Sequence, residues 1–206
     1  MVQSSSEAIL RKTIPFIVIS FVAIAGLTGC SSTKPNTNQG VNVPSSTPTS
    51  NLNFPGKLSN DQIQDKKAVI TTAKGTIEIE LWADKAPLSV SNFVYLANQG
   101  YYNNLTFHRV EPGFVAQGGD PTGTGTGGPG YQFPDEPVKE DYKEGTVAMA
   151  NSGPNTNGSQ FFISLVDNSQ NLAKSYNLFG QVTGGMNVVK QIAVGDKMTS
   201  VKIEAK

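Results

Sequence analysis

Apolar and polar residues alternate in two short runs near residue 70, and this alternation predicts a β-hairpin. The first run is Ala68–Thr72, and in the second, Thr76–Leu81, two Ile and one Leu share one face while two Glu share the other. A period of two residues is typical of a strand that is buried on one side. Gly75 lies between the runs and suits a turn. The hairpin should therefore place one face against a core and the other against water.

The period changes further along the chain. Pro87 opens a stretch with apolar residues at helical spacing that ends at Gly100, and a second helix is predicted at Met186–Ile192. Many short strands, Gly-rich turns and two isolated helices indicate a mainly β fold, which we expect to be a closed antiparallel β-barrel with helical caps. The further predicted strands are Thr106–Val110, Phe114–Gly118, Thr146–Ala150, Phe161–Leu165 and Thr199–Glu204.

The N-terminus has the pattern of a targeting signal. Arg11 and Lys12 precede an uncharged apolar run, Ile14–Leu27, which is shorter than the about 20 residues of a membrane-spanning helix. The next residues end at Cys30, and the sequence LTGC of residues 27–30 resembles the bacterial lipobox. That resemblance implies that residues 1–29 are removed as a lipoprotein signal peptide and that Cys30 is lipidated. The alternative is a short N-terminal membrane anchor with an incidental cysteine.

Residues 31–56 consist mainly of Ser, Thr, Asn, Pro and Gly. Such a segment has too little apolar surface to offset the entropy lost on ordering. We therefore expect residues 30–65 to be a disordered tether and residues 66–206 to form one folded domain. The expected location is the cell membrane, by a lipid anchor on the extracytoplasmic side, either periplasmic or at the outer surface.

Composition excludes several classes of function. Sixteen basic side chains balance sixteen acidic ones, which argues against a nucleic-acid-binding protein. One Cys excludes an intramolecular disulfide and a zinc site built on several cysteines, and one His excludes a site built on a His pair. We accordingly expect neither a metal nor a cofactor.

Two segments differ from ordinary core strands. They are Phe107–Asp120, with the sequence FHRVEPGFVAQGGD, and Met149–Ile163, with the sequence MANSGPNTNGSQFFI. Together they resemble the signature of the cyclophilins, peptidyl-prolyl cis-trans isomerases whose fold is an eight-stranded β-barrel capped by two helices. The resemblance covers about residues 66–206 and includes Gly125–Gly128 and Leu178–Gly180. It implies an enzyme that accelerates rotation about X-Pro bonds.

These residue types suit that chemistry. The X-Pro bond rotates slowly because its nitrogen lone pair is delocalised into the carbonyl, which gives a barrier of about 20 kcal/mol. Lowering the barrier requires an apolar slot for the proline ring and a fixed hydrogen-bond donor. The hydrogen bond from this donor should become stronger as the nitrogen becomes pyramidal in the transition state. Arginine suits the second role because it is always charged and carries several donors in one plane.

The resemblance assigns residues to these roles. Arg109 matches the catalytic Arg, and Phe114 and Gln117 belong to the same catalytic group. Substrate-binding roles fall on Val115, Ala150, Asn151, Gln160, Phe162, Leu172 and Tyr176. Strand alternation adds that Phe114 and Ala116 share one face while Val115 and Gln117 share the other, and that of Phe161 and Phe162 one enters the core and the other the pocket. By the same rule, His108 should face away from Arg109.

The chain departs from the family pattern in three places. Val115 stands where the family often has Met. With a one-residue insertion in the alignment, Asn171 stands where many members have Trp, and Tyr176 where His is common. Loss of the Trp implies weak binding of cyclosporin, since its indole supplies a donor and a flat contact. Residues 123–128 fit the nucleotide-binding pattern G-x-G-x-x-G, but the following Pro129-Gly130 cannot open the helix that such a site needs.

The leading hypothesis is a membrane-tethered isomerase, expected to be a monomer, that acts on Xaa-Pro segments of folding proteins outside the cytoplasm. The alternative is a low-turnover proline-peptide-binding lipoprotein or chaperone, in which the slot is retained without fast catalysis. A solute-binding lipoprotein would need two lobes and a longer chain.

Overall fold

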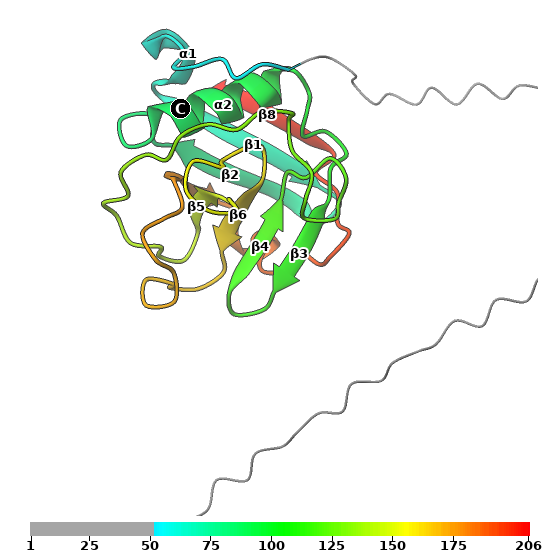
Figure 1. Cartoon of the computed structure of the whole chain (residues 1–206). Helices are drawn as coiled ribbons and strands as arrows, with labels where there is room; N and C mark the ends of the chain where they lie inside the picture. The colour runs from blue at the N-terminus through cyan, green and yellow to red at the C-terminus, as the bar shows by residue number, and fades with distance from the viewer. Residues whose placement is uncertain (1–51) are drawn as a thin grey trace, which may run out of the picture. The chain divides into compact units, whose positions relative to one another are not determined.

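The predicted hairpin is present in the computed structural model, which describes residues 52–206 (Figure 1). Strand β1 (Lys66–Thr72) pairs antiparallel with β2 (Gly75–Leu81), with Ile70 opposite Ile77. Alternate residues of both strands are buried, as the sequence pattern requires. The predicted signal peptide, the lipid site at Cys30 and most of the predicted tether lie outside the described residues.

Eight strands form one sheet in which every pair is antiparallel. Their order across the sheet is β3-β4-β6-β5-β7-β2-β1-β8. The remaining strands are β3 (Phe107–Glu111), β4 (Val115–Gly118), β5 (Thr146–Met149), β6 (Phe161–Ser164), β7 (Leu178–Gly184) and β8 (Ser200–Ala205). The mainly β prediction is confirmed, and the predicted strands match within two residues at each end.

The prediction of a closed barrel is wrong. The sheet curls, but its edge strands β3 and β8 do not pair with each other, and only an isolated bridge between Thr106 and Lys197 joins the segments that precede them. The Phe107 N–H donates to the Asp196 carbonyl at 2.9 Å and the Met198 N–H to the Leu105 carbonyl at 2.9 Å. These bonds reach only Phe107, the first residue of β3, and stop at Met198 before β8 begins, so the fold is an open half-barrel.

Strand β7 was not predicted, although it lies between β5 and β2 inside the sheet. Gly180 interrupts its hydrophobic pattern, so the segment lacks the regular alternation that predicts a strand. The structure explains this glycine, because a Cβ there would lie 2.7 Å from the Glu80 carbonyl oxygen and 2.9 Å from a methyl group of Ile79. Close approach of β7 to β2 therefore requires glycine at this position.

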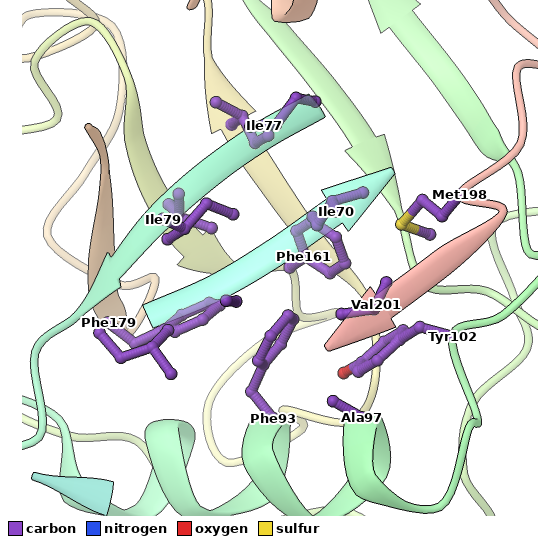
Figure 2. Packing of buried hydrophobic residues seen from close by; sticks show 14 of the residues in the cluster. Ile70, Ile77, Ile79, Phe93, Ala97, Tyr102, Phe161, Phe179, Met198 and Val201 are labelled. Atoms are coloured by element: carbon purple, nitrogen blue, oxygen red, sulfur yellow. The ribbon is translucent and has the colours of Figure 1, made fainter. Parts of the chain in front are cut away.

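The inner face of the sheet forms the main core, and helix α2 (Pro87–Asn98) covers it. Figure 2 shows Phe93 and Ala97 pointing from α2 toward the strands. The Phe93 ring lies 4.9 Å from Tyr102, 5.5 Å from Phe161 and 5.3 Å from Phe179 between ring centroids. Aromatic pairs at these separations add stability beyond the burial of their area.

A distant carboxylate caps the first turn of α2. The N-cap residue is Ala86, whose side chain cannot accept a hydrogen bond. Glu136 accepts from the Leu88 N–H at 2.7 Å and from the Ser89 N–H at 2.9 Å, and its charge also suits the positive end of the helix. Glu136 thereby fixes the loop after Phe133 to the helix.

The other helices are short. Helix α3 (Met186–Val189) occupies the first part of the predicted second helix. Helix α1 (Asn60–Ile63) was not predicted, and its Ile63 is fully buried in the main core. Leu52–Asp65 thus packs on the domain, and the packed part of the chain begins before Lys66. Between residues 52 and 206, no helix has the length and apolar character needed to span a membrane.

Candidate active site

Strand β3 carries a β-bulge that turns Arg109 to the outer face of the sheet. Phe107 pairs with Gly118 and Arg109 with Gln117, so His108 and Arg109 together stand opposite Gln117. Phe107 is fully buried in the main core, whereas the Arg109 side chain is 46% exposed. In a regular strand these two residues would share a face. The bulge therefore separates a core residue from the predicted catalytic residue within one short strand.

A chain of hydrogen bonds fixes Arg109. Its Nη1 donates to Gln117 Oε1 at 3.1 Å, and Gln117 Nε2 donates to Gln160 Oε1 at 2.9 Å. Gln160 Nε2 then donates to the carbonyls of Gly125 at 3.0 Å and Gly127 at 2.8 Å. Three predicted site residues are thus joined, and a backbone loop anchors the end of the chain.

Glu111 is a second partner of Arg109 that the sequence reasoning missed. Its Oε1 accepts from Arg109 Nε at 2.8 Å and from Nη2 at 2.6 Å. Residues two apart on a strand share a face, and this signal could have identified the pair. The guanidinium has five N–H donors, so its contacts with Glu111 and Gln117 leave donors free for a ligand.

Next to Arg109 the outer face carries a second, smaller apolar cluster. Phe162 and Val115 are almost fully buried in it, and the Arg109 guanidinium carbon lies 5.8 Å from the centre of the Phe114 ring. The prediction that Phe161 and Phe162 face opposite sides is confirmed, since Phe161 belongs to the inner core and Phe162 to this cluster. The prediction that Phe114 shares a face with Ala116 is wrong, because Ala116 lies in the inner core while Phe114, which precedes β4, packs against the outer cluster. The predicted pocket residues found in the cluster are Phe114, Val115, Ala150, Phe162, Leu172 and Tyr176.

The loop of residues 166–177 forms one wall of this cluster. Tyr176 meets Phe162 edge to face, with ring centroids 5.5 Å apart, and Leu172 packs against the same group, whereas Asn171 is exposed. Asn168 anchors the loop by donating from Nδ2 to the Phe114 carbonyl at 2.8 Å. The structure therefore brings Leu172 and Tyr176 to the pocket, as the alignment with one inserted residue predicts.

Tyr142 fixes this wall through hydrogen bonds to the backbone of Tyr176. It is fully buried, its hydroxyl donates to the Tyr176 carbonyl at 2.9 Å, and the Tyr176 N–H donates back to the hydroxyl oxygen at 3.0 Å. Burial raises the pKa of Tyr142, so the phenol stays protonated and can donate. One side chain thus fixes both backbone groups of Tyr176. Nothing in the local sequence indicates this role.

A cavity of about 700 Å³ adjoins the apolar cluster. Gln117 and Gln160 line it on the side of Arg109, and Ala150 and Asn151 line it on the side of β5. The Ala150 N–H donates to the Gln160 carbonyl at 2.9 Å, and Asn151 Nδ2 donates to the Ser175 carbonyl at 2.9 Å. All predicted site residues of the domain therefore lie in one continuous region, which consists of an apolar cluster, a guanidinium and a polar groove.

The loop that ends the hydrogen-bond chain is organised by Asp120. Its carboxylate accepts from the N–H groups of Thr122 at 2.7 Å, Thr124 at 3.0 Å and Gly125 at 2.5 Å. Burial by itself would raise the pKa of Asp120, but hydrogen bonds that include those from Thr122 and Gly125 hold it below the ordinary value. Residues 123–128, which fit a nucleotide-binding pattern, thus wrap around a carboxylate of the protein itself.

His108 does not follow the alternation from which we predicted that it faces away from Arg109. At the bulge both residues stand opposite Gln117, and the His108 ring approaches within 4.0 Å of where a Cβ on Gly125 would lie. Both ring nitrogens are buried without a hydrogen-bond partner, and burial lowers the pKa of His108. The imidazole is therefore neutral at pH 7 and packs against the loop.

Comparisons with known proteins agree with this geometry. The sequence model of the family described as cyclophilin type peptidyl-prolyl cis-trans isomerase/CLD matches residues 67–205. A peptidyl-prolyl cis-trans isomerase of Synechococcus elongatus is 46% identical over 139 residues, which cover 66% of this chain and 95% of the relative. Peptidyl-prolyl cis-trans isomerase B of Bacillus subtilis is 47% identical over 130 residues, 62% of this chain and 90% of the relative.

Solved structures show the same similarity. A cyclophilin type peptidyl-prolyl cis-trans isomerase of Cryptosporidium parvum is 34% identical with a TM-score of 0.64, covering 68% of this chain and 98% of its own. A second structure of that protein, determined in the presence of the dipeptide Ala-Pro, has a TM-score of 0.63 at 34% identity and covers 68% and 99%.

Tyr142→Phe should weaken binding of proline peptides with little change in packing. The substitution removes the hydroxyl that fixes Tyr176 but keeps the ring, so we expect a loss of about 1 kcal/mol in unfolding free energy. The Kd for a short Ala-Pro peptide should rise roughly three- to tenfold, as titration can measure, because a comparable free energy is lost from the pocket wall. Thr72→Val removes a hydroxyl that donates to the Gly75 carbonyl at the distant hairpin and serves as the control. Equal peptide affinity in the wild type and both variants would contradict the role of Tyr142.

Asp120→Asn should destabilise the domain in a pH-dependent way. Because the folded-state pKa of Asp120 is depressed, its stabilisation is present above the ordinary carboxyl pKa and is lost as the pH falls through the folded value. We expect a loss of about 2 kcal/mol at pH 7, measured by urea unfolding, that shrinks as the pH falls below the ordinary carboxyl pKa. Asp61→Asn, at an exposed position, should change stability by less than about 0.5 kcal/mol. A loss of unfolding free energy in Asp120→Asn that does not change with pH would show that the charge of Asp120 does not hold the loop.

Proposed function

The chain belongs to the cyclophilin-type family of peptidyl-prolyl cis-trans isomerases and is an enzyme of that kind; we propose that Arg109 and the outer apolar pocket carry the reaction, and that the enzyme works outside the cytoplasm on a lipid anchor at Cys30. The observation that carries the first part is the fixed guanidinium of Arg109 beside the apolar cluster around Phe162.

The pocket suits a proline ring. Its walls are the side chains of Phe162, Val115 and Leu172, with Tyr176 and Phe114 at its sides. Burial of a small apolar ring among such groups contributes binding free energy in proportion to the apolar area removed from water. The ring is the one part of an X-Pro pair that does not rotate with the preceding carbonyl, so gripping it leaves the other side of the bond free to turn.

Arg109 supplies the donor that the rotation requires. As the amide twists, its nitrogen loses conjugation and gains a localised lone pair, which accepts a hydrogen bond better than the planar ground state does. A free N–H of Arg109 directed at that nitrogen stabilises the transition state more than the substrate. Because Glu111 and Gln117 already fix the guanidinium, little reorganisation accompanies the twist.

The polar groove beside the pocket extends recognition to the rest of the peptide. Gln160, Ala150 and Asn151 line the cavity next to Gln117, where main-chain groups of an extended peptide can be matched. A relative of known structure was determined with the dipeptide Ala-Pro, which supports an X-Pro unit as the ligand for this surface. We infer that the substrates are Xaa-Pro segments of unfolded or folding chains.

The place of action follows from the N-terminal sequence. An uncharged apolar run after Arg11 and Lys12, followed by Leu27-Thr28-Gly29-Cys30, supports export and lipidation at Cys30. Residues 31–51 would span at most about 75 Å, so the domain would work close to a membrane. Proteins leaving a secretion channel unfolded contain X-Pro bonds that equilibrate only over tens of seconds without catalysis, which makes them suitable substrates.

Arg109→Ala should lower kcat/KM for isomerisation of an Xaa-Pro peptide by about 10²- to 10³-fold, because a preorganised donor at the transition state is lost. The full chain is assayed by exchange between the cis and trans signals of the peptide in NMR spectra. Lys202→Ala, at an exposed position on β8, should retain wild-type activity. An Arg109→Ala variant as active as the wild type would overturn the mechanism. A wild type no faster than the uncatalysed reaction would favour the peptide-binding alternative.

Cys30→Ala should abolish lipidation. In a bacterial host we expect the wild type to incorporate labelled palmitate, to accumulate as a precursor with globomycin and to fractionate with membranes. Ser31→Ala should behave as the wild type, since it leaves the only cysteine of the chain in place. Palmitate incorporation by the Cys30→Ala variant, or its absence from the wild type, would contradict the anchor.

A further inference from the structure

A segment outside the family region packs against the groove. Residues Leu52–Leu58, which we term the strap, precede the residues 67–205 that the family model matches. Within the strap, Leu52, Phe54 and Leu58 are partly buried against the main core. The Leu58 N–H donates to Ser91 Oγ on α2 at 2.9 Å. The strap is therefore part of the domain, although its sequence is that of a tether.

Phe54 is the strap residue that contacts the groove wall. Its ring stacks on Phe133 with centroids 5.0 Å apart and planes 5° from parallel. It also meets Tyr131 at 5.8 Å between centroids. Phe133 is almost fully buried and Tyr131 is half-buried, so Phe54 covers an aromatic pair that would otherwise be more exposed.

Tyr131 belongs to the cavity that adjoins Gln117 and Gln160. Its hydroxyl donates to Asn92 Oδ1 at 2.7 Å, and Asn92 Nδ2 donates to the Gly158 carbonyl at 2.8 Å. Gly158 lines the same cavity from the opposite segment, and a Cβ at this glycine would lie 3.2 Å from a ring carbon of Pro129. The segment 129–133 is thus one wall of the groove, and its distance from Gly158 is set on one side by Asn92.

Asn157 and the strap make further contacts with the 129–133 wall. Phe133 is tied to Asn157 by two hydrogen bonds, from the Phe133 N–H to the Asn157 carbonyl at 2.9 Å and from Asn157 Nδ2 to the Phe133 carbonyl at 3.2 Å. Between Pro129 and Tyr131 the chain passes through Gly130, whose φ is +88°. Among the aromatic contacts of the described residues, Tyr131 meets only Phe54.

We propose that Phe54 is a positioning residue of the isomerase, which holds the 129–133 wall against the groove and so adjusts the binding of substrate residues that flank the X-Pro pair. The inference rests on the proposed placement of the substrate along the pocket and groove. The chemistry of the partner is that of an extended peptide with several residues on either side of the X-Pro bond. The X-Pro pair itself lies against Arg109 and the apolar cluster and does not need the strap.

The proposal separates short substrates from long ones. Loss of an aromatic stack changes an equilibrium by roughly two- to tenfold. In the full chain, Phe54→Ala should raise KM by this factor for a nine-residue peptide with a central Ala-Pro, with kcat unchanged. For a blocked Ala-Pro dipeptide, kcat/KM should stay at the wild-type value. Phe54→Tyr keeps the stack and should restore KM for the long peptide, whereas Phe54→Leu keeps apolar volume without a ring and should not.

Leu58→Ala provides the matched control, because Leu58 belongs to the same strap and packs on the core and α2. It should lower the thermal midpoint as Phe54→Ala does but leave the ratio of KM for long and short peptides unchanged. An unchanged ratio in both Phe54→Ala and Phe54→Leu would overturn the proposal and leave the strap a stabilising segment only. That outcome differs from a failure of the proposed mechanism, which would appear as full activity of Arg109→Ala on either peptide.

Discussion

The pairing of Arg109 with Gln117 across the bulge of β3 is the constraint on which the site depends. Each face of the sheet carries its own apolar cluster, a large one under α2 and a small one around Phe162. Regular alternation would have directed Arg109 toward the side that Phe107 fills. One extra residue lets Phe107 close the core while Arg109 reaches the outer cluster, so folding stability and chemistry draw on different faces of the same strands.

This arrangement makes the donor rigid through contacts that are mostly polar and long-range in sequence. Asp120 organises a loop, the loop carbonyls fix Gln160, Gln160 fixes Gln117, and Gln117 fixes Arg109. Tyr142 plays a similar part for the apolar wall at Tyr176. A reaction without covalent intermediates relies on such preorganisation, because its transition state differs from the substrate mainly in the conjugation and shape of one amide.

Local patterns predicted what local physics controls. The β1–β2 hairpin, helix α2 and the opposite facing of Phe161 and Phe162 follow from periods of two and 3.6 residues. Features set by tertiary contact were missed or wrong. Gly180 hid β7 because its reason is the neighbouring strand, and His108 was misplaced because a bulge has no sequence signature in a single chain. The strap reads as tether because its few apolar residues are buried only by tertiary contacts, such as those of Phe54 with Tyr131 and Phe133, which are far away in the sequence. The pocket residues came from family resemblance, which carries tertiary information that periodicity lacks.

The strap also decides how the domain would respond to force. Strand β1 is paired on both sides, with β2 and with β8, so a pull along it must break many hydrogen bonds at once. A load applied at Leu52 meets the ring contacts of Phe54 first, then the single bond from Leu58 to Ser91, each of which can open alone. The contacts of the strap are therefore mechanically weaker than the strand pairing of β1 that follows them in the chain. Tension on its N-terminal end would peel the strap from the groove wall while the sheet stays intact.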